Sequence, residues 1–101
     1  MPFVRAARKD EIAPGSIREF QVDGLTVAIA NVGTRFYAIN NTCLHRAGPL
    51  GQGVIQGVAV ACPWHGWQYD LTTGKHTMNP AVAVKTYGIE VRGDDIWIET
   101  E

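Results

Sequence analysis

The sequence lacks several features that would assign a protein to a broad class. Neither charge is in excess, since nine lysines and arginines face ten aspartates and glutamates, whereas nucleic-acid-binding domains usually carry a basic stripe. No apolar run reaches the roughly 18 residues needed to span a bilayer as a helix. Only two cysteines are present. The composition therefore argues against a nucleic-acid-binding, transmembrane or disulfide-rich protein.

The N-terminal segment MPFVRAARKDE is charged early and lacks the apolar core of a signal peptide. We therefore expect a cytoplasmic protein. In that compartment, paired thiols more often bind metals or do redox work than form structural disulfides. The chain length suits a single domain, residues 1–101, and a hydrophobic content of 46% provides a core. So short a chain also gains stability from a bound metal.

Short alternating segments separated by turn residues predict an all-β fold, an antiparallel sandwich or barrel. The dipeptide Asp23-Gly24 is a strong hairpin signal between strands expected at 16–22 and 25–32. The other expected elements are strands at 35–40, 58–61, 67–70, 84–92 and 96–100, and one helical turn at 8–13.

Two stretches, 41–53 and 62–66, interrupt the strand pattern, and loops on a β scaffold commonly carry binding residues. The first contains the motif C-L-H and the second the motif C-P-W-H, so each offers one thiolate and one imidazole. A single buried cysteine is usually a small apolar filler. Two Cys/His pairs in glycine-rich loops instead indicate a metal site, with these four candidate ligands: Cys43, His45, Cys62 and His65.

These four donor residues do not by themselves identify the metal. Two thiolates and two imidazoles can hold a structural zinc ion, although zinc sites usually pair the cysteines in one knuckle and place the histidines on a helix. The same set matches a [2Fe–2S] centre in which two histidines replace two cysteines on one iron. A structural zinc module that mediates binding therefore remains an alternative to an iron–sulfur protein.

The segments CLHRAGPLGQG and CPWHGWQYD resemble the two cluster-binding loops of Rieske proteins, whose signature is C-x-H followed at a distance by C-x-x-H. Here sixteen residues separate the two motifs. The segments FYAINNTC, DLTTGK and DDIWIET also resemble soluble Rieske-type ferredoxins, so the resemblance covers nearly the whole chain. It implies an antiparallel β fold with two cluster-binding loops at one end and one [2Fe–2S] cluster per chain.

The resemblance also implies roles for individual residues. Cys43 and Cys62 would bind one iron, and His45 and His65 the other. Gly48, Gly51 and Gly66 would let the loops turn tightly and bring backbone amides to the bridging sulfides. A third loop, 77–81, would cover the cluster with Pro80. The remaining residues expected around the cluster are Arg46, Trp64, Trp67 and Tyr69, of which Tyr69 is the candidate hydrogen-bond donor to a ligand sulfur.

The chain differs from the Rieske proteins of respiratory and photosynthetic complexes. Those carry an extra cysteine in each loop, where this chain has Trp64 and Gly48 or a neighbour, and a serine hydroxyl where it has Trp67. Hydrogen bonds to the sulfurs help to set the reduction potential, and they favour the more negative, reduced cluster. Because one donor is missing, we expect a low potential, as in the soluble ferredoxins that serve bacterial oxygenases.

The resemblance therefore implies an electron carrier and not an enzyme. It would pass one electron from a flavoprotein reductase to a terminal oxygenase, such as an aromatic-ring-hydroxylating dioxygenase, and a monomer would suit this role. A catalytic non-haem iron needs two histidines and a carboxylate, and only His76, which we expect to be solvated, is left over. The small subunit of an assimilatory nitrite reductase shares the fold and is the second interpretation.

Overall fold

The computed structural model describes residues 3–33, 35–43, 48–63 and 66–100. These residues form short strands and two single-turn 3₁₀ helices. In chain order the elements are β1 Val4–Arg8, η1 Lys9–Glu11, β2 Ser16–Val22, β3 Leu25–Asn31, β4 Phe36–Asn40, η2 Leu50–Gln52, β5 Val54–Gln56, β6 Ala59–Ala61, β7 Gln68–Asp70, β8 Thr86–Arg92 and β9 Asp95–Glu99. Across the described ranges, no helix has the length and apolar character required to cross a membrane.

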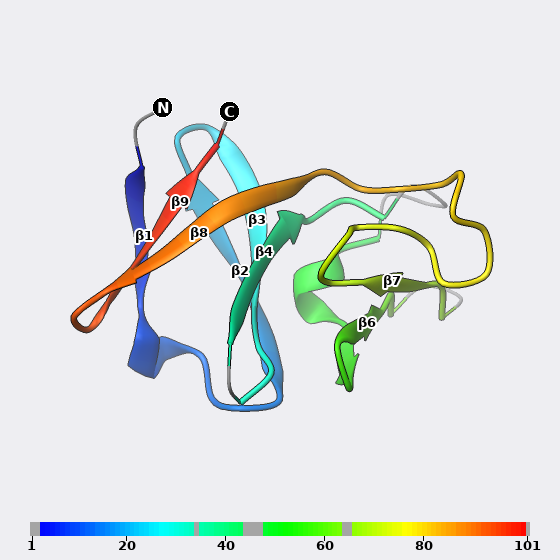
Figure 1. The fold of residues 1–101 in the computed structure, drawn as a ribbon, viewed down its shortest axis with the longest axis horizontal. Helices are drawn as coiled ribbons and strands as arrows, with labels where there is room; N and C mark the ends of the chain where they lie inside the picture. Colours follow the sequence, from blue (N-terminus) through cyan, green and yellow to red (C-terminus); the bar gives the residue numbers. More distant parts are fainter. Residues whose placement is uncertain (1–2, 34, 44–47, 64–65, 101) are drawn as a thin grey trace.

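The strands form two antiparallel sheets (Figure 1). The large sheet has the order β1-β9-β8-β4-β3-β2, and the small sheet has the order β5-β6-β7. Strands β1 and β2, at the two ends of the large sheet, contact each other, so this sheet curls into a nearly closed barrel. The small sheet lies beside it, on the right in Figure 1. The predicted all-β antiparallel fold is confirmed.

The β2–β3 hairpin forms as its turn residues predict. Asp23 and Gly24 have φ angles of 52° and 80°, which is the left-handed conformation that a two-residue hairpin turn of the I′ type requires. Val22 pairs with Leu25, and the register runs without a shift to the pair Ser16 and Asn31. This hairpin anchors β3, which lies between β2 and β4 in the large sheet.

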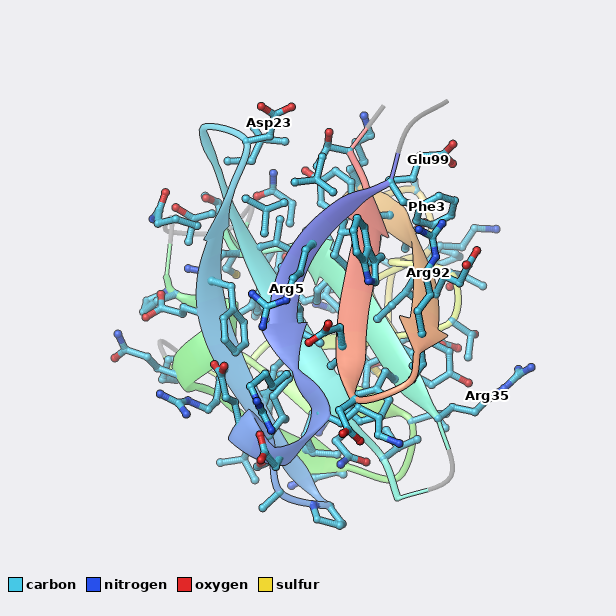
Figure 2. The ribbon with its side chains drawn as sticks, turned by 90° about the vertical axis from the view of Figure 1, so that its left-hand side faces the viewer. Phe3, Arg5, Asp23, Arg35, Arg92 and Glu99 are labelled. Carbon is cyan, nitrogen blue, oxygen red and sulfur yellow. The ribbon has the colours of Figure 1, made fainter. Side chains whose placement is uncertain are left out.

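Strands β1 and β5 were not among the predicted elements. Strand β1 has the sequence VRAAR, and its arginines and alanines have little intrinsic preference for a strand. It is held instead by antiparallel pairing with β9 from the other end of the chain and by an ion pair between Arg5 and Asp95 at 3.1 Å. Figure 2 shows Arg5 on β1 beside β9. Strand β5 is three residues long and depends on pairing with β6.

The interior is divided into two apolar cores. The side chains of β3 alternate between the two cores: Ala28 and Ala30 pack in one, and Val27 and Ile29 pack in the other. The first core gathers buried residues of the small sheet and the loops: Cys43, Leu50, Val60, Cys62, Tyr69, Leu71 and Val84. The second lies inside the curled sheet and includes Ile96 and Ile98 of β9. Both cysteines therefore belong to the same core.

Candidate metal centre

Each cysteine stands at the base of a loop that a backbone hydrogen bond closes. The amide of Cys43 donates to the carbonyl of Gly48 at 2.9 Å. The amide of Cys62 donates to the carbonyl of Trp67 at 2.7 Å, and Gly66 donates back to the carbonyl of Cys62 at 3.2 Å. These bonds tie each cysteine backbone to the far end of its own loop.

Both cysteine side chains are buried, with exposed fractions of 1% for Cys43 and 2% for Cys62. The hydroxyl oxygen of Tyr69, a residue with no exposed surface, lies 3.4 Å from the Sγ atom of Cys43. A thiolate sulfur accepts hydrogen bonds only, so the hydroxyl is the donor when Cys43 is a metal ligand. A buried thiol acting as filler would not need such a partner, and the donor set fits a thiolate-bound cluster.

The glycines serve the loops in different ways. Gly66 has a φ angle of 71°, a conformation that other residues rarely adopt, and an added Cβ would meet open space there. The expectation for Gly51 is wrong: its amide donates to Oδ1 of Asn41 at 2.6 Å, so it does not point to a sulfide. An added Cβ at Gly51 would collide with the side chain of Glu19 on β2. A glycine is required at position 51 because the first loop lies directly against β2 at this point.

A small polar network attaches the first loop to β2. Asn41 is buried, and its Nδ2 donates to Oε2 of Glu19 at 2.5 Å. Nε2 of Gln52 donates to Oε1 of the same carboxylate at 3.0 Å. Together with the contact between Asn41 and Gly51, these bonds hold both ends of the first loop against one strand.

His76 is not solvated as expected. It is buried, and its ring lies edge-on to Trp67, with centroids 4.5 Å apart, and to Tyr69, with centroids 5.6 Å apart. The cause is an antiparallel bridge between His76 and Tyr69, because directly opposed residues in such a pair have their side chains on the same face. The tight turn DLTTGK, which sends the chain back along β7, is the sequence signal for this pairing.

The turn that follows β7 is held by Asp70. Its carboxylate accepts hydrogen bonds from the hydroxyl of Thr72 at 2.6 Å and from the amide of Thr72 at 2.8 Å. Because these bonds favour the charged carboxylate, they lower the pKa of Asp70, and the bond from the hydroxyl of Thr72 has the largest effect.

The third loop follows this turn. Pro80 is exposed there, and the amide of Val82 donates to the carbonyl of Asn79 at 2.9 Å.

Four of the predicted site residues, His45, His65, Arg46 and Trp64, lie outside the described residues. Among the residues that the structure does describe, no three histidine, cysteine or acidic side chains form a metal-binding group. The structure brings Cys43, Cys62 and Tyr69 together in one core, with Trp67 packed against it. The complete ligand set stays a prediction.

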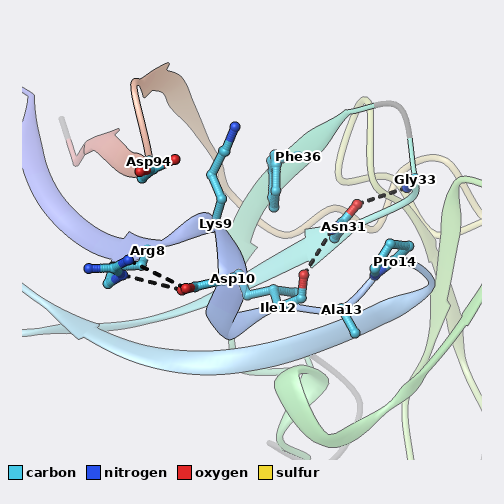
Figure 3. A pocket seen from close by; sticks show the side chains of 10 residues that line it. All are labelled: Arg8, Lys9, Asp10, Ile12, Ala13, Pro14, Asn31, Gly33, Phe36 and Asp94. Carbon is cyan, nitrogen blue, oxygen red and sulfur yellow. Dashed lines mark hydrogen bonds and ion pairs between the residues drawn. The ribbon is translucent and has the colours of Figure 1, made fainter.

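A hollow of about 530 Å³ lies elsewhere, between η1, Asn31 and Asp94 (Figure 3). Asn31 already has structural partners there, since its Nδ2 donates to the carbonyl of Ile12 and its Oδ1 accepts from the amide of Gly33, each at 2.8 Å. The described residues that line it come from neither cysteine loop. This hollow is separate from the candidate metal centre.

The fold and the site define a small all-β protein in which two loops place their cysteines in one buried core. The family model of the Rieske [2Fe-2S] domain matches residues 3–88 of the chain. The chain belongs to the Rieske [2Fe–2S] family, and its cofactor is a [2Fe–2S] cluster. The predicted family and cofactor are thereby confirmed.

Relatives that match nearly the whole chain include ferredoxin components of dioxygenase systems. The biphenyl dioxygenase ferredoxin subunit of Pseudomonas sp. (strain KKS102) is 32% identical over 98% of this chain and 93% of the relative. The solved ferredoxin of carbazole 1,9a-dioxygenase from Nocardioides aromaticivorans IC177 is 32% identical, covers 100% of both chains and has a TM-score of 0.91. A solved complex of reduced oxygenase and oxidized ferredoxin in carbazole 1,9a-dioxygenase matches with 28% identity, 98% and 94% coverage and a TM-score of 0.86.

Proposed function

We propose that this chain is the ferredoxin component of a multicomponent oxygenase system of the aromatic-ring-hydroxylating dioxygenase type. It carries one electron to the terminal oxygenase, and it is not the catalytic subunit. The relatives that match nearly its whole length are ferredoxin components of such systems. The carbazole system supplies a precedent for direct docking, because its ferredoxin has been solved in complex with its oxygenase.

The cluster ligands in this proposal are Cys43 and Cys62 on one iron and His45 and His65 on the other. The observation that supports it most directly is that two cysteines from separate loops are buried in one core, with the hydroxyl of Tyr69 on the sulfur of Cys43. When bound, a [2Fe–2S] cluster takes up and releases one electron.

The chain's own residues prepare the site for this charge change. The apolar core excludes water from the two sulfurs, and the closed loop bases hold the cysteine backbones in place. The hydroxyl of Tyr69 donates to a sulfur that becomes more negative on reduction, and hydrogen bonds to charged acceptors are the stronger ones. Trp67 supplies no hydroxyl, which supports a potential that is low for a Rieske centre.

The remaining parts of the proposal concern the partners and the setting. A flavin-containing reductase would supply the electron. A monomer would be able to dock with the reductase and then with the oxygenase through the same end of the molecule, where the cluster is bound. Residues 1–101 would act as one cluster-carrying domain, and the protein would work in the cytoplasm.

Two measurements test the proposal in sequence. Iron, sulfide and zinc are assayed on anaerobically purified protein, and an EPR spectrum is recorded after reduction with dithionite. We expect two irons and two sulfides per chain and a rhombic signal from one reduced [2Fe–2S] cluster. One zinc per chain without sulfide, after anaerobic reconstitution, would instead identify a structural zinc module.

The second measurement mixes the reduced protein in a stopped-flow instrument with oxidised terminal oxygenases from biphenyl, naphthalene and carbazole dioxygenase systems. Reoxidation of this chain together with reduction of at least one oxygenase is the expected result. Cys62→Ser, which removes a proposed ligand, is the control and should transfer no electron. A cluster-loaded protein that reduces none of the three would contradict its assignment to these systems.

A further inference from the structure

The ring of His76 is anchored through one nitrogen. Its Nδ1 accepts hydrogen bonds from two backbone amides of the third loop, Met78 at 3.0 Å and Asn79 at 3.1 Å. A nitrogen that accepts in this way has no proton, so in the neutral ring the proton is on Nε2. His76 therefore fastens the start of the third loop and is itself fixed in one orientation.

The other ring nitrogen gains nothing from its burial. Nε2 of His76 is buried and has no hydrogen-bond partner among the described residues. Burying an unpaired polar group carries a free-energy cost, and an apolar side chain of similar size would avoid it. The reason for a histidine here is therefore the acceptor at Nδ1 combined with the shape of the ring, and not the filling of space.

The anchored ring supports the residue that contacts the cysteine. It lies edge-on to Tyr69 at an interplanar angle of 84° and to Trp67 at 81°. The backbone is fixed as well, since the amide of His76 donates to the carbonyl of Val82 at 2.8 Å and the amide of Thr77 donates to that of Gln68 at 2.9 Å. Packed rings of this kind limit the rotation of a buried tyrosine.

We infer that His76 is a positioning residue for electron transfer: by holding Tyr69, it keeps the tyrosine hydroxyl directed at the sulfur of Cys43. Nδ1 and the third loop fix the ring, the ring fixes Tyr69, and Tyr69 supplies the hydrogen bond that favours the reduced cluster. This inference rests on the proposed assignment of Cys43 as a cluster ligand. It predicts that His76 affects the reduction potential by acting through Tyr69.

The test is a double-mutant cycle read by reduction potential. The variants are His76→Leu, Tyr69→Phe and the two combined, each titrated by optical spectroelectrochemistry with the cluster content measured. We expect His76→Leu to lower the midpoint potential. At the potential where half of the wild-type protein is reduced, the ratio of oxidised to reduced variant should be about threefold higher than in wild type. This ratio corresponds to a shift of about 30 mV for one electron. In the Tyr69→Phe background, the same change should produce no further shift, because the hydroxyl is already gone.

Met78→Ala is the matched control, since this side chain lies in the same loop and is 86% exposed. It should leave the midpoint unchanged. A fully loaded His76→Leu protein with the wild-type midpoint would overturn the inference, and so would a shift that is equally large with and without the hydroxyl of Tyr69.

A second variant covers the case in which His76→Leu does not load a cluster. His76→Phe keeps an aromatic ring beside Tyr69 and removes both ring nitrogens, of which only Nδ1 accepts hydrogen bonds from the described residues. The same cycle then applies to it, with a smaller lowering of the midpoint expected. Wild-type protein without a [2Fe–2S] cluster would refute the proposed function. A loaded wild type with no coupling between positions 76 and 69 would refute only this inference.

Discussion

Replacing Tyr69 with phenylalanine removes one oxygen atom from the candidate site and keeps the buried ring. The ring has no exposed surface and packs in the first core, so the fold should survive. The substitution eliminates the hydrogen bond between the hydroxyl and the Sγ atom of Cys43, which are 3.4 Å apart. Because this bond favours the more negative state of the cluster, its removal should lower the reduction potential.

The size of the shift in reduction potential depends on how much the hydrogen bond strengthens when the cluster gains negative charge. A hydrogen bond to a charged acceptor contributes about 1.5–3 kcal/mol, and the bond is present in both oxidation states. If about a third of this energy is gained on reduction, the difference is about 0.5–1 kcal/mol. For one electron this corresponds to a potential lower by about 20–40 mV.

A redox titration followed by visible absorption and EPR measures the midpoint, and Tyr87→Phe provides a matched control. The hydroxyl of Tyr87 also takes part in a hydrogen bond, accepted from Nδ2 of Asn40 at 3.3 Å, but the ring belongs to the second core, to which neither cysteine belongs. Tyr87→Phe should leave the midpoint unchanged. An unchanged midpoint in Tyr69→Phe, or equal shifts in both variants, would refute the assigned role of the hydroxyl.

Three further predictions follow from the same structure. Gly51→Ala should destabilise the protein by about 1–3 kcal/mol in urea unfolding, because the new Cβ collides with the side chain of Glu19. Thr72→Val should raise the lowered pKa of Asp70, so the variant should be less stable than wild type at neutral pH. The difference in stability should disappear as pH falls through the folded-state pKa of Asp70, which thermal melts across acidic pH will measure. Cys62→Ser should lose the cluster and speed amide exchange in β5–β7, while β9 stays protected.

Local sequence signals were sufficient for the hairpin and for both cysteine loops. The left-handed turn at Asp23-Gly24 is dictated by those two residues alone, and β2 has the predicted bounds Ser16–Val22. The loops were recognisable because Cys/His motifs and glycines interrupt the strand alternation. Tyr69 was identified from its position in a motif, and its contact with Cys43 needed the fold to become visible.

The features that the sequence did not reveal depend on contacts between distant segments. Strand β1 exists because β9 pairs with it, and nothing local in VRAAR requires a strand. Gly51 was expected to serve a sulfide, but Asn41 takes its amide and the side chain of Glu19 takes the space where a Cβ would be. His76 was expected to be solvated because single-residue spacing says nothing about the strand partner that buries it.

The two cores explain how a short chain can both fold and hold a cofactor. The second core, with the apolar residues of β9 and one face of β3, includes neither cysteine, so the curled sheet can form from apolar burial alone. The first core joins the opposite face of β3 to the small sheet and both cysteines. A three-stranded sheet of three-residue strands has little stability of its own. Binding a cluster there would therefore complete the less stable part of the molecule and leave the supporting sheet unchanged.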